Sequence, residues 1–180
     1  MDYFEAIVKT LLEDDGFWTR QSFKVNVSKD EKRQIGKPTI PRPEIDLIAY
    51  KPASKEILAI EVKSFLDSSG VHLSSLQERH DIPNGRYKLF TCSNYRDIVF
   101  NRLNHDLMDA GLIASPHKIR LGLAAGNVYQ KSEPDIREYL NNHDMFFWGP
   151  SEIKTRIQAL AKKGYENDPT VIAAKVLLRD

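Results

Sequence analysis

Two neighbouring apolar segments of this 180-residue chain carry charged residues inside what would otherwise be buried strands. The segments read PEIDLIAY over residues 43–50 and EILAIEVK over residues 56–63. Their aliphatic and β-branched content predicts strands over about 44–51 and 56–65, and the short linker 51–55 suits an antiparallel hairpin. A buried carboxylate is costly unless a cation compensates it. Asp46, Glu61 and Lys63 are therefore the first candidates for a functional site.

The alternation of side chains along a strand predicts how these three residues are arranged. Asp46 lies on one face of the first strand, and Glu61 and Lys63 share one face of the second. In a hairpin of suitable register, Asp46 lies beside Glu61, with Lys63 one step further along. The opposite faces are uniformly apolar and are expected to pack into the core; they carry Ile45, Leu47 and Ala49 on the first strand and Leu58, Ile60 and Val62 on the second.

This combination suits a hard divalent cation such as Mg²⁺, which prefers oxygen ligands and keeps several waters. Asp46 and Glu61 would supply two ligands, and the backbone carbonyl of Val62 is a candidate third. A bound ion lowers the pKa of its water and neutralises charge on a phosphate. Lys63 would orient or deprotonate the attacking water, or stabilise the transition state. The pattern points to metal-dependent hydrolysis of a phosphodiester.

Other interpretations of these residues stay open. The strand acids also fit a solvated hairpin with edge charges, and Glu61-Val62-Lys63 alone is a common pattern. Glu5 is a fourth candidate, because it lies at the boundary of the apolar face of a helix predicted over residues 3–15 and can reach toward the sheet. A favourable charge near the N-terminus of that helix is the alternative role for Glu5.

The rest of the chain predicts an α/β fold, a mixed β-sheet flanked by helices with a C-terminal helical extension. Residues 1–130 would form the core and 131–180 the extension, packed together as one structural domain. Ser151 is the expected cap of the helix 152–163, and Asp168-Pro169 would open the last helix. The further elements expected are a strand over 17–27, a polar loop over 28–42, a helix over 73–79, a strand over 87–92, a helix over 96–113, a strand over 119–125 and a helix over 133–141.

Composition narrows the functional classes. The formal net charge is +1, so a nucleic-acid partner would have to be met by local basic patches. The only cysteine, Cys92, excludes a disulfide framework and a cysteine-rich zinc site. No apolar run approaches the length of a membrane span, and the N-terminus lacks the features of a secretory signal. We therefore expect a cytoplasmic protein without a membrane partner.

These residues resemble the PD-(D/E)xK nuclease superfamily, which includes restriction endonucleases, archaeal Holliday-junction resolvases and RecB-like nuclease domains. The segment 43–46 is similar to the PD element, with two residues inserted between the proline and Asp46, and residues 61–63 match the (D/E)xK element. The resemblance covers residues 1 to about 125. It implies a restriction-endonuclease-like fold, Mg²⁺ or Mn²⁺ as cofactor, Asp46 and Glu61 as metal ligands, Lys63 as the catalytic lysine and Glu5 as an assisting acid.

The resemblance also implies a DNA partner, duplex or branched. The candidates for DNA contacts in the loop 28–42 are Lys29, Lys32, Arg33, Lys37 and Arg42, although a solvated flexible loop is the alternative. RecB-like members carry a glutamine followed four residues later by tyrosine; here Gln77 is followed by Asp81, so this element is incomplete, and Gln77 is either a substrate contact or exposed surface. For the C-terminal helices, packing on the core or contact in a homodimer is the favoured role, ahead of reading DNA.

The leading hypothesis from the sequence is a metal-dependent DNA endonuclease. A non-catalytic nucleic-acid-binding module on the same fold is the alternative, but such a module has no need to keep all four charged positions. A third interpretation is an α/β interaction protein whose acids are incidental. Sequence preference depends on loops and dimer geometry, which the residue pattern does not specify.

Overall fold

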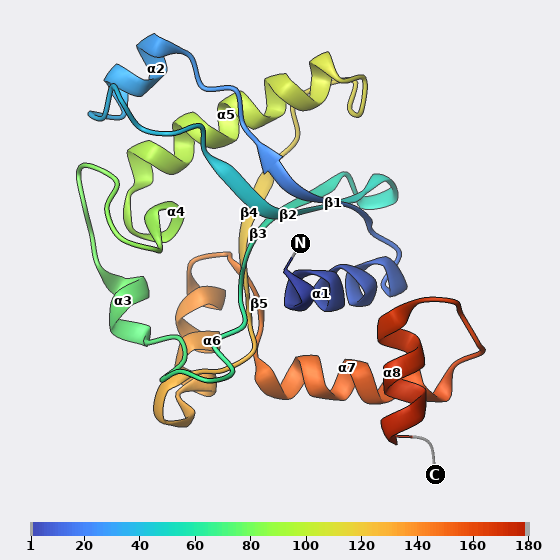
Figure 1. Cartoon of the computed structure of the whole chain (residues 1–180). Coiled ribbons are helices and arrows are strands. Elements are labelled where there is room, and N and C mark those ends of the chain that lie inside the picture. Colours follow the sequence, from blue (N-terminus) through green and yellow to red (C-terminus); the bar gives the residue numbers. More distant parts are fainter. Residues whose placement is uncertain (1, 179–180) are drawn as a thin grey trace.

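The computed structural model describes residues 2–178 and, within them, a five-stranded mixed sheet with helices on both sides (Figure 1). The strands lie side by side in chain order. The pairs β1–β2 and β2–β3 are antiparallel, whereas β3–β4 and β4–β5 are parallel. The α/β class predicted from the sequence is confirmed. The bounds are β1 Trp18–Lys24, β2 Glu44–Lys51, β3 Glu56–Lys63, β4 Ile119–Ala125 and β5 Phe146–Trp148.

The helices cover the sheet in two layers (Figure 1). Side chains of α1, α7 and α8 pack on one face, and those of α3 to α6 pack on the other. In the described part of the chain, none of the helices combines the length and apolar character needed to cross a bilayer. Their bounds are α1 Tyr3–Asp14, α2 Lys29–Gln34, α3 Leu73–Gln77, α4 Lys88–Thr91, α5 Ser93–Asp109, α6 Glu133–Asn142, α7 Pro150–Lys162 and α8 Pro169–Leu178, with short 3₁₀ turns η1 Pro52–Ser54 and η2 Tyr129–Lys131.

The hairpin β2–β3 forms the centre of the fold, as the sequence predicts. Its register sets Leu47 opposite Ile60 and Tyr50 opposite Ile57. Leu47 and Ile60 are fully buried against α1, and Ile57 is fully buried on the opposite face. Both faces of the hairpin are thus covered, whereas the residue pattern predicts one core face. Ile45, predicted to share a face with Leu47, is instead buried in the cluster that contains Ile48 and Ile57. Strands buried on both faces read as nearly continuous apolar runs, which is why a charge within them stands out.

The strand predicted over residues 87–92 is wrong, because this segment forms the short helix α4. Thr91 is buried and donates its hydroxyl hydrogen to the Tyr87 carbonyl at 3.0 Å. A short apolar run buried on all sides does not distinguish helix from strand by periodicity. The chain passes from α4 directly into α5, which begins at Ser93, three residues before the predicted start, and ends at Asp109.

The segment predicted as a polar loop over residues 28–42 contains the helix α2. Ser28 caps this helix by a capping box, in which its hydroxyl accepts the Glu31 N–H and the Glu31 carboxylate accepts the Ser28 N–H. Arg102 of α5 donates two hydrogen bonds to Glu31 Oε1, from Nε at 3.0 Å and from Nη2 at 2.8 Å, and this ion pair is called the Glu31–Arg102 clasp below. The helix is therefore secured at its start by one local and one long-range interaction.

The C-terminal third contains the strand β5, which the sequence analysis did not predict. Residues 146–148 pair with β4 and so extend the sheet into the predicted extension 131–180. The end residues 1, 179 and 180 of the predicted core and extension lie outside the described residues. The helix α8 begins at Pro169, as expected, and the Asp168 carboxylate accepts the N–H of Thr170.

Ser151 is not the cap of α7, contrary to the prediction. The cap position is Gly149, and Pro150 takes the first helical position, where its missing N–H costs nothing. Ser151 instead donates its backbone N–H to the Glu133 carboxylate at 3.1 Å and its hydroxyl to the same group. The Glu133 side chain of α6 thus accepts hydrogen bonds from the first turn of α7, a role that no local sequence pattern reveals.

The Glu31–Arg102 clasp predicts a pH-dependent stability. Burial alone would raise the pKa of Glu31, but the hydrogen bonds from Arg102 and Ser28 outweigh it and lower the pKa. The stabilisation is present above the unfolded pKa of about 4.3 and is lost as pH falls through the lower folded pKa. We expect Glu31→Gln to reduce the free energy of unfolding by about 1 kcal/mol at pH 7 and by almost nothing near pH 3. Urea denaturation at both pH values measures this.

Asp30→Asn is the matched control, because Asp30 pairs with Arg33 on the exposed side of the same helix. It should leave stability nearly unchanged at both pH values. An equal loss in the two variants would show that the effect belongs to the charge of α2 and not to the clasp.

Candidate functional site

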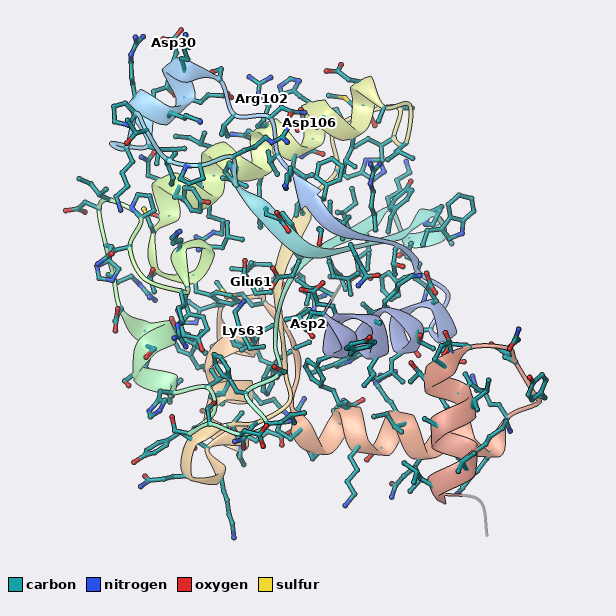
Figure 2. The ribbon with its side chains drawn as sticks, viewed as in Figure 1. Asp2, Asp30, Glu61, Lys63, Arg102 and Asp106 are labelled. Atoms are coloured by element: carbon teal, nitrogen blue, oxygen red, sulfur yellow. The ribbon has the colours of Figure 1, made fainter. Side chains whose placement is uncertain are left out.

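The ends of β2 and β3 bring Asp46, Glu61 and Lys63 into direct contact. The Lys63 ammonium lies 3.1 Å from Asp46 Oδ2 and 2.9 Å from Glu61 Oε2. All three side chains are mostly shielded from solvent, with 22%, 13% and 18% of their side-chain surfaces exposed for Asp46, Glu61 and Lys63. Figure 2 shows Glu61 and Lys63 near the middle of the molecule, beside the ends of these strands. The proximity of Asp46, Glu61 and Lys63 that the hairpin predicts is thus observed.

A backbone hydrogen bond holds Asp46 in this position. The paired residues of β2 and β3 end at Leu47 and Ile60, and one residue further the Asp46 carboxylate accepts the Val62 N–H at 2.8 Å. The N–H and C=O of one strand residue point toward the same side. The Val62 carbonyl therefore faces the same edge as Asp46, where the sequence analysis placed a third ligand.

The electrostatics of the cluster are dominated by the shared ammonium. Burial alone would lower the pKa of Lys63, but the carboxylates of Glu61 and Asp46 outweigh it and raise the pKa. Burial and the charge of Asp46 raise the pKa of Glu61, against the opposing effect of Lys63. The lysine contacts two carboxylates whereas each carboxylate contacts one lysine, so the cationic form of Lys63 is the more strongly stabilised state.

Glu5 lies close enough to the cluster to interact with its charges. Burial, Asp46 and Asp2 raise the pKa of Glu5, while Gln21 and Lys63 lower it. Glu5 belongs to the first turn of α1, where a carboxylate also interacts favourably with the helix dipole. It is not part of the cleft lining described next, so it approaches Asp46 from the α1 side.

The three charged residues lie in a cleft of about 540 Å³. Asp46, Glu61 and Lys63 contribute to it from the sheet, and residues 40–44, 85–86 and 88–89 supply much of the remaining lining. Tyr95 from α5 also lines the cleft, and its burial, with Glu61 and Cys92 nearby, raises its pKa to about 12. The cleft therefore combines three carboxylates, those of Glu44, Asp46 and Glu61, with a lining that contains several cations.

The end of β3 is held against β4 by a close backbone approach. Gly126 donates its N–H to the Lys63 carbonyl at 2.9 Å. A Cβ atom at position 126 would lie 2.4 Å from the Ser64 carbonyl oxygen, so only glycine fits there without a shift. Phe65 then turns the chain with φ of +46°, a strained value for a bulky residue, and lines the cleft.

Of the residues predicted to contact DNA, the fold places only Arg42 in the lining of the cleft. Arg42 lines the cleft, whereas Gln77 is exposed at the end of α3 and lies outside the lining. Lys37 donates to the Pro83 carbonyl at 2.5 Å. In Figure 2, Asp30 of α2 lies well apart from Glu61. The candidates carried by α2 itself are Lys29, Lys32 and Arg33.

Among the residues that the structure adds to the cleft, and that the sequence did not single out, are Arg86, Lys88 and Tyr95. A signal was present for Lys88, because it is a cation within the apolar run 87–92, the same kind of anomaly that singled out Asp46. The incorrect strand assigned to that run concealed its position. Arg86 and Tyr95 carry no comparable local signal.

The donor set of the cleft fits a hard divalent ion. Asp46, Glu61 and the Val62 carbonyl offer oxygen atoms at one edge, as Mg²⁺ and Mn²⁺ prefer. Across residues 2–178, no group of three or more acidic, histidine or cysteine side chains is gathered to hold a metal. An ion at Asp46 and Glu61 would therefore complete its shell with backbone oxygen and water, which is the habit of Mg²⁺.

Comparisons with known proteins do not assign a family. No family model matches the chain, and no curated protein matches it. Among solved structures, it is similar to one described as "Crystal Structure of Protein of Unknown Function AF1548", with a TM-score of 0.40 and 18% sequence identity. That match covers 96% of this chain and 78% of the other.

The shared ammonium predicts a measurable loss when it is removed. Lys63→Met leaves two shielded carboxylates without their cation, and we expect the free energy of unfolding to fall by about 2 kcal/mol. Adding Asp46→Asn to this variant should recover part of the loss, because one uncompensated charge is gone. Thermal and urea denaturation of the single and double variants provide the measurement.

Lys118→Met is the matched control, since Lys118 pairs with Asp144 on the exposed surface. Exposed pairs contribute little, so its stability should stay near that of the unchanged protein. If Lys63→Met were as stable as this control, the ammonium would not be what allows Asp46 and Glu61 to lie together.

Proposed function

We propose that this protein is a metal-dependent endonuclease that hydrolyses DNA phosphodiester bonds, a member of the PD-(D/E)xK superfamily. The observation that carries the proposal is the contact of Lys63 with both Asp46 and Glu61 in one cleft at the end of the central hairpin. Two carboxylates and a lysine in a shielded cleft match the requirements of phosphodiester hydrolysis, which needs metal ligands and a cation beside the reacting phosphate.

The roles of the residues follow from their positions. Mg²⁺ or Mn²⁺ bound by Asp46, Glu61 and the Val62 carbonyl would supply Lewis-acid stabilisation and a water of lowered pKa. Lys63, which already contacts both ligands, orients the attacking water or stabilises the charge that develops on the phosphate. Glu5 assists from the α1 side through its proximity to Asp46.

A purely structural role for the cluster is the less favourable interpretation. Replacing a shielded ion pair by apolar residues is often neutral or stabilising, so such a cluster is weak evidence for stability alone. Here the charges interrupt strands that are otherwise apolar, and they line a cleft instead of closing a core. A non-catalytic nucleic-acid-binding module remains the alternative, with the same cleft and no hydrolysis.

The proposed partner is DNA, duplex or branched. A homodimer belongs to the proposal as well, because cutting both strands of a duplex in a related way suits a two-fold pair of sites. A cytoplasmic location is part of the same proposal.

A cleavage assay tests the activity directly. Purified protein is incubated with supercoiled plasmid, linear duplex, single-stranded DNA and a four-way junction, each with Mg²⁺, Mn²⁺ or a chelator. We expect metal-dependent cutting, and we expect Lys63→Ala and Asp46→Asn to lower the rate at least about 100-fold. Lys154→Ala, an exposed lysine of α7, is the matched control and should cut normally. Cutting that persists in a chelator, or in Lys63→Ala, would contradict the proposal.

Metal binding gives a readout that does not depend on turnover. Calorimetric titration with Mg²⁺ and with Mn²⁺ should detect binding to the unchanged protein and its loss in Asp46→Asn. Asp135→Asn, at an exposed position of α6, should bind as the unchanged protein does. Binding that is equal in both variants would remove Asp46 from the ligand set.

A further inference from the structure

The cleft contains three cations that the catalytic proposal does not use. Arg42 comes from the segment just before β2, and Arg86 and Lys88 come from the segment that leads into α4. These two segments are far apart in sequence, yet both line the cavity that contains Asp46 and Glu61. Lys88 is also close enough to Glu61 to lower its pKa, against the larger effect of burial.

These cations are available for a ligand. Within residues 2–178, no carboxylate oxygen lies within 4.0 Å of their side-chain nitrogens, whereas Arg102 and Arg120 are held in ion pairs. Arg42 donates to the Asn26 side-chain oxygen at 3.0 Å. The Arg86 guanidinium lies 5.8 Å from the centroid of the Phe65 ring. Neutral partners such as these orient a cation without cancelling its charge.

The acids of the same cleft are partly compensated by cations. Glu44 lies 3.7 Å from the Lys24 ammonium, and Asp46 and Glu61 share that of Lys63. The lining holds four cations, Arg42, Lys63, Arg86 and Lys88, against three acids, so the cleft is locally positive within a chain whose net charge is +1. This local positive charge, and not the net charge of the whole protein, would attract a polyanion.

We propose that Arg42, Arg86 and Lys88 bind successive phosphates of a nucleic-acid strand and so set the phosphodiester between them over Asp46, Glu61 and Lys63. The inference rests on the proposed function and deepens it, because it names the residues that hold the strand on both sides of the cleaved bond. Guanidinium and ammonium groups from two segments can contact several phosphates at once, which a single phosphomonoester cannot supply.

The salt dependence of binding tests this surface without any turnover. A labelled DNA duplex of about 20 base pairs is titrated with protein in a chelator, by fluorescence anisotropy over a range of salt concentrations. In the triple variant Arg42→Gln, Arg86→Gln and Lys88→Gln, the slope of log K against log salt should become shallower by about 3, or about 0.9 for each lost phosphate contact. The control triple variant carries Lys118→Gln, Lys154→Gln and Lys162→Gln, which removes the same charge from exposed positions outside the cleft lining.

A shallower slope in the cleft variant alone would support the inference, and a nucleoside monophosphate should then compete far more weakly than a short oligonucleotide. Equal slopes in the two triple variants and the unchanged protein would overturn it, even if the protein cuts DNA. A shallower slope in the cleft variant of a protein that cuts nothing would support the binding surface while the proposed hydrolysis fails. Thermal denaturation of both triple variants checks that they are folded.

Discussion

The contact of one ammonium with two carboxylates is the interaction on which the site depends. Asp46 and Glu61 come from neighbouring strands and would repel each other in a cleft that shields them from water. Lys63 lies on the same strand face as Glu61 and contacts both. The Val62 N–H adds a hydrogen bond that keeps Asp46 at the end of the paired region. Asp46 is therefore held both by the charge of Lys63 and by a backbone hydrogen bond from Val62.

The surrounding fold allows this contact to exist. Helices on both faces bury the apolar residues of β2 and β3, which makes the hairpin rigid and its register unambiguous. The cleft begins where the pairing of β2 with β3 ends, so the charged residues lie at the boundary between the core and solvent. Gly126 lets β4 approach the end of β3 closely, which fixes the strand that carries Lys63.

Much of this arrangement could be predicted where the signal is local. The apolar, β-branched content identified both strands of the hairpin, alternation along a strand identified the shared face of Glu61 and Lys63, and helical periodicity identified α1. The prediction failed for α4, because a short and mostly apolar run carries no clear period. It also failed for β5, whose three residues pair only because β4 is already in place, and it missed α2, although Ser28 and Glu31 form a recognisable capping box.

Within the candidate site, too, some residues could be predicted from the sequence and others could not. Asp46, Glu61 and Lys63 are separated by few residues, and a tight hairpin converts their spacing into proximity, so the amino-acid order was sufficient to group them. Arg86, Lys88 and Tyr95 join them only through the packing of α4 and α5 on the sheet. Long-range packing depends on how many side chains fill a shared volume, which no short window of sequence contains. The charged centre was therefore readable along the chain, whereas the cleft that surrounds it required the folded molecule.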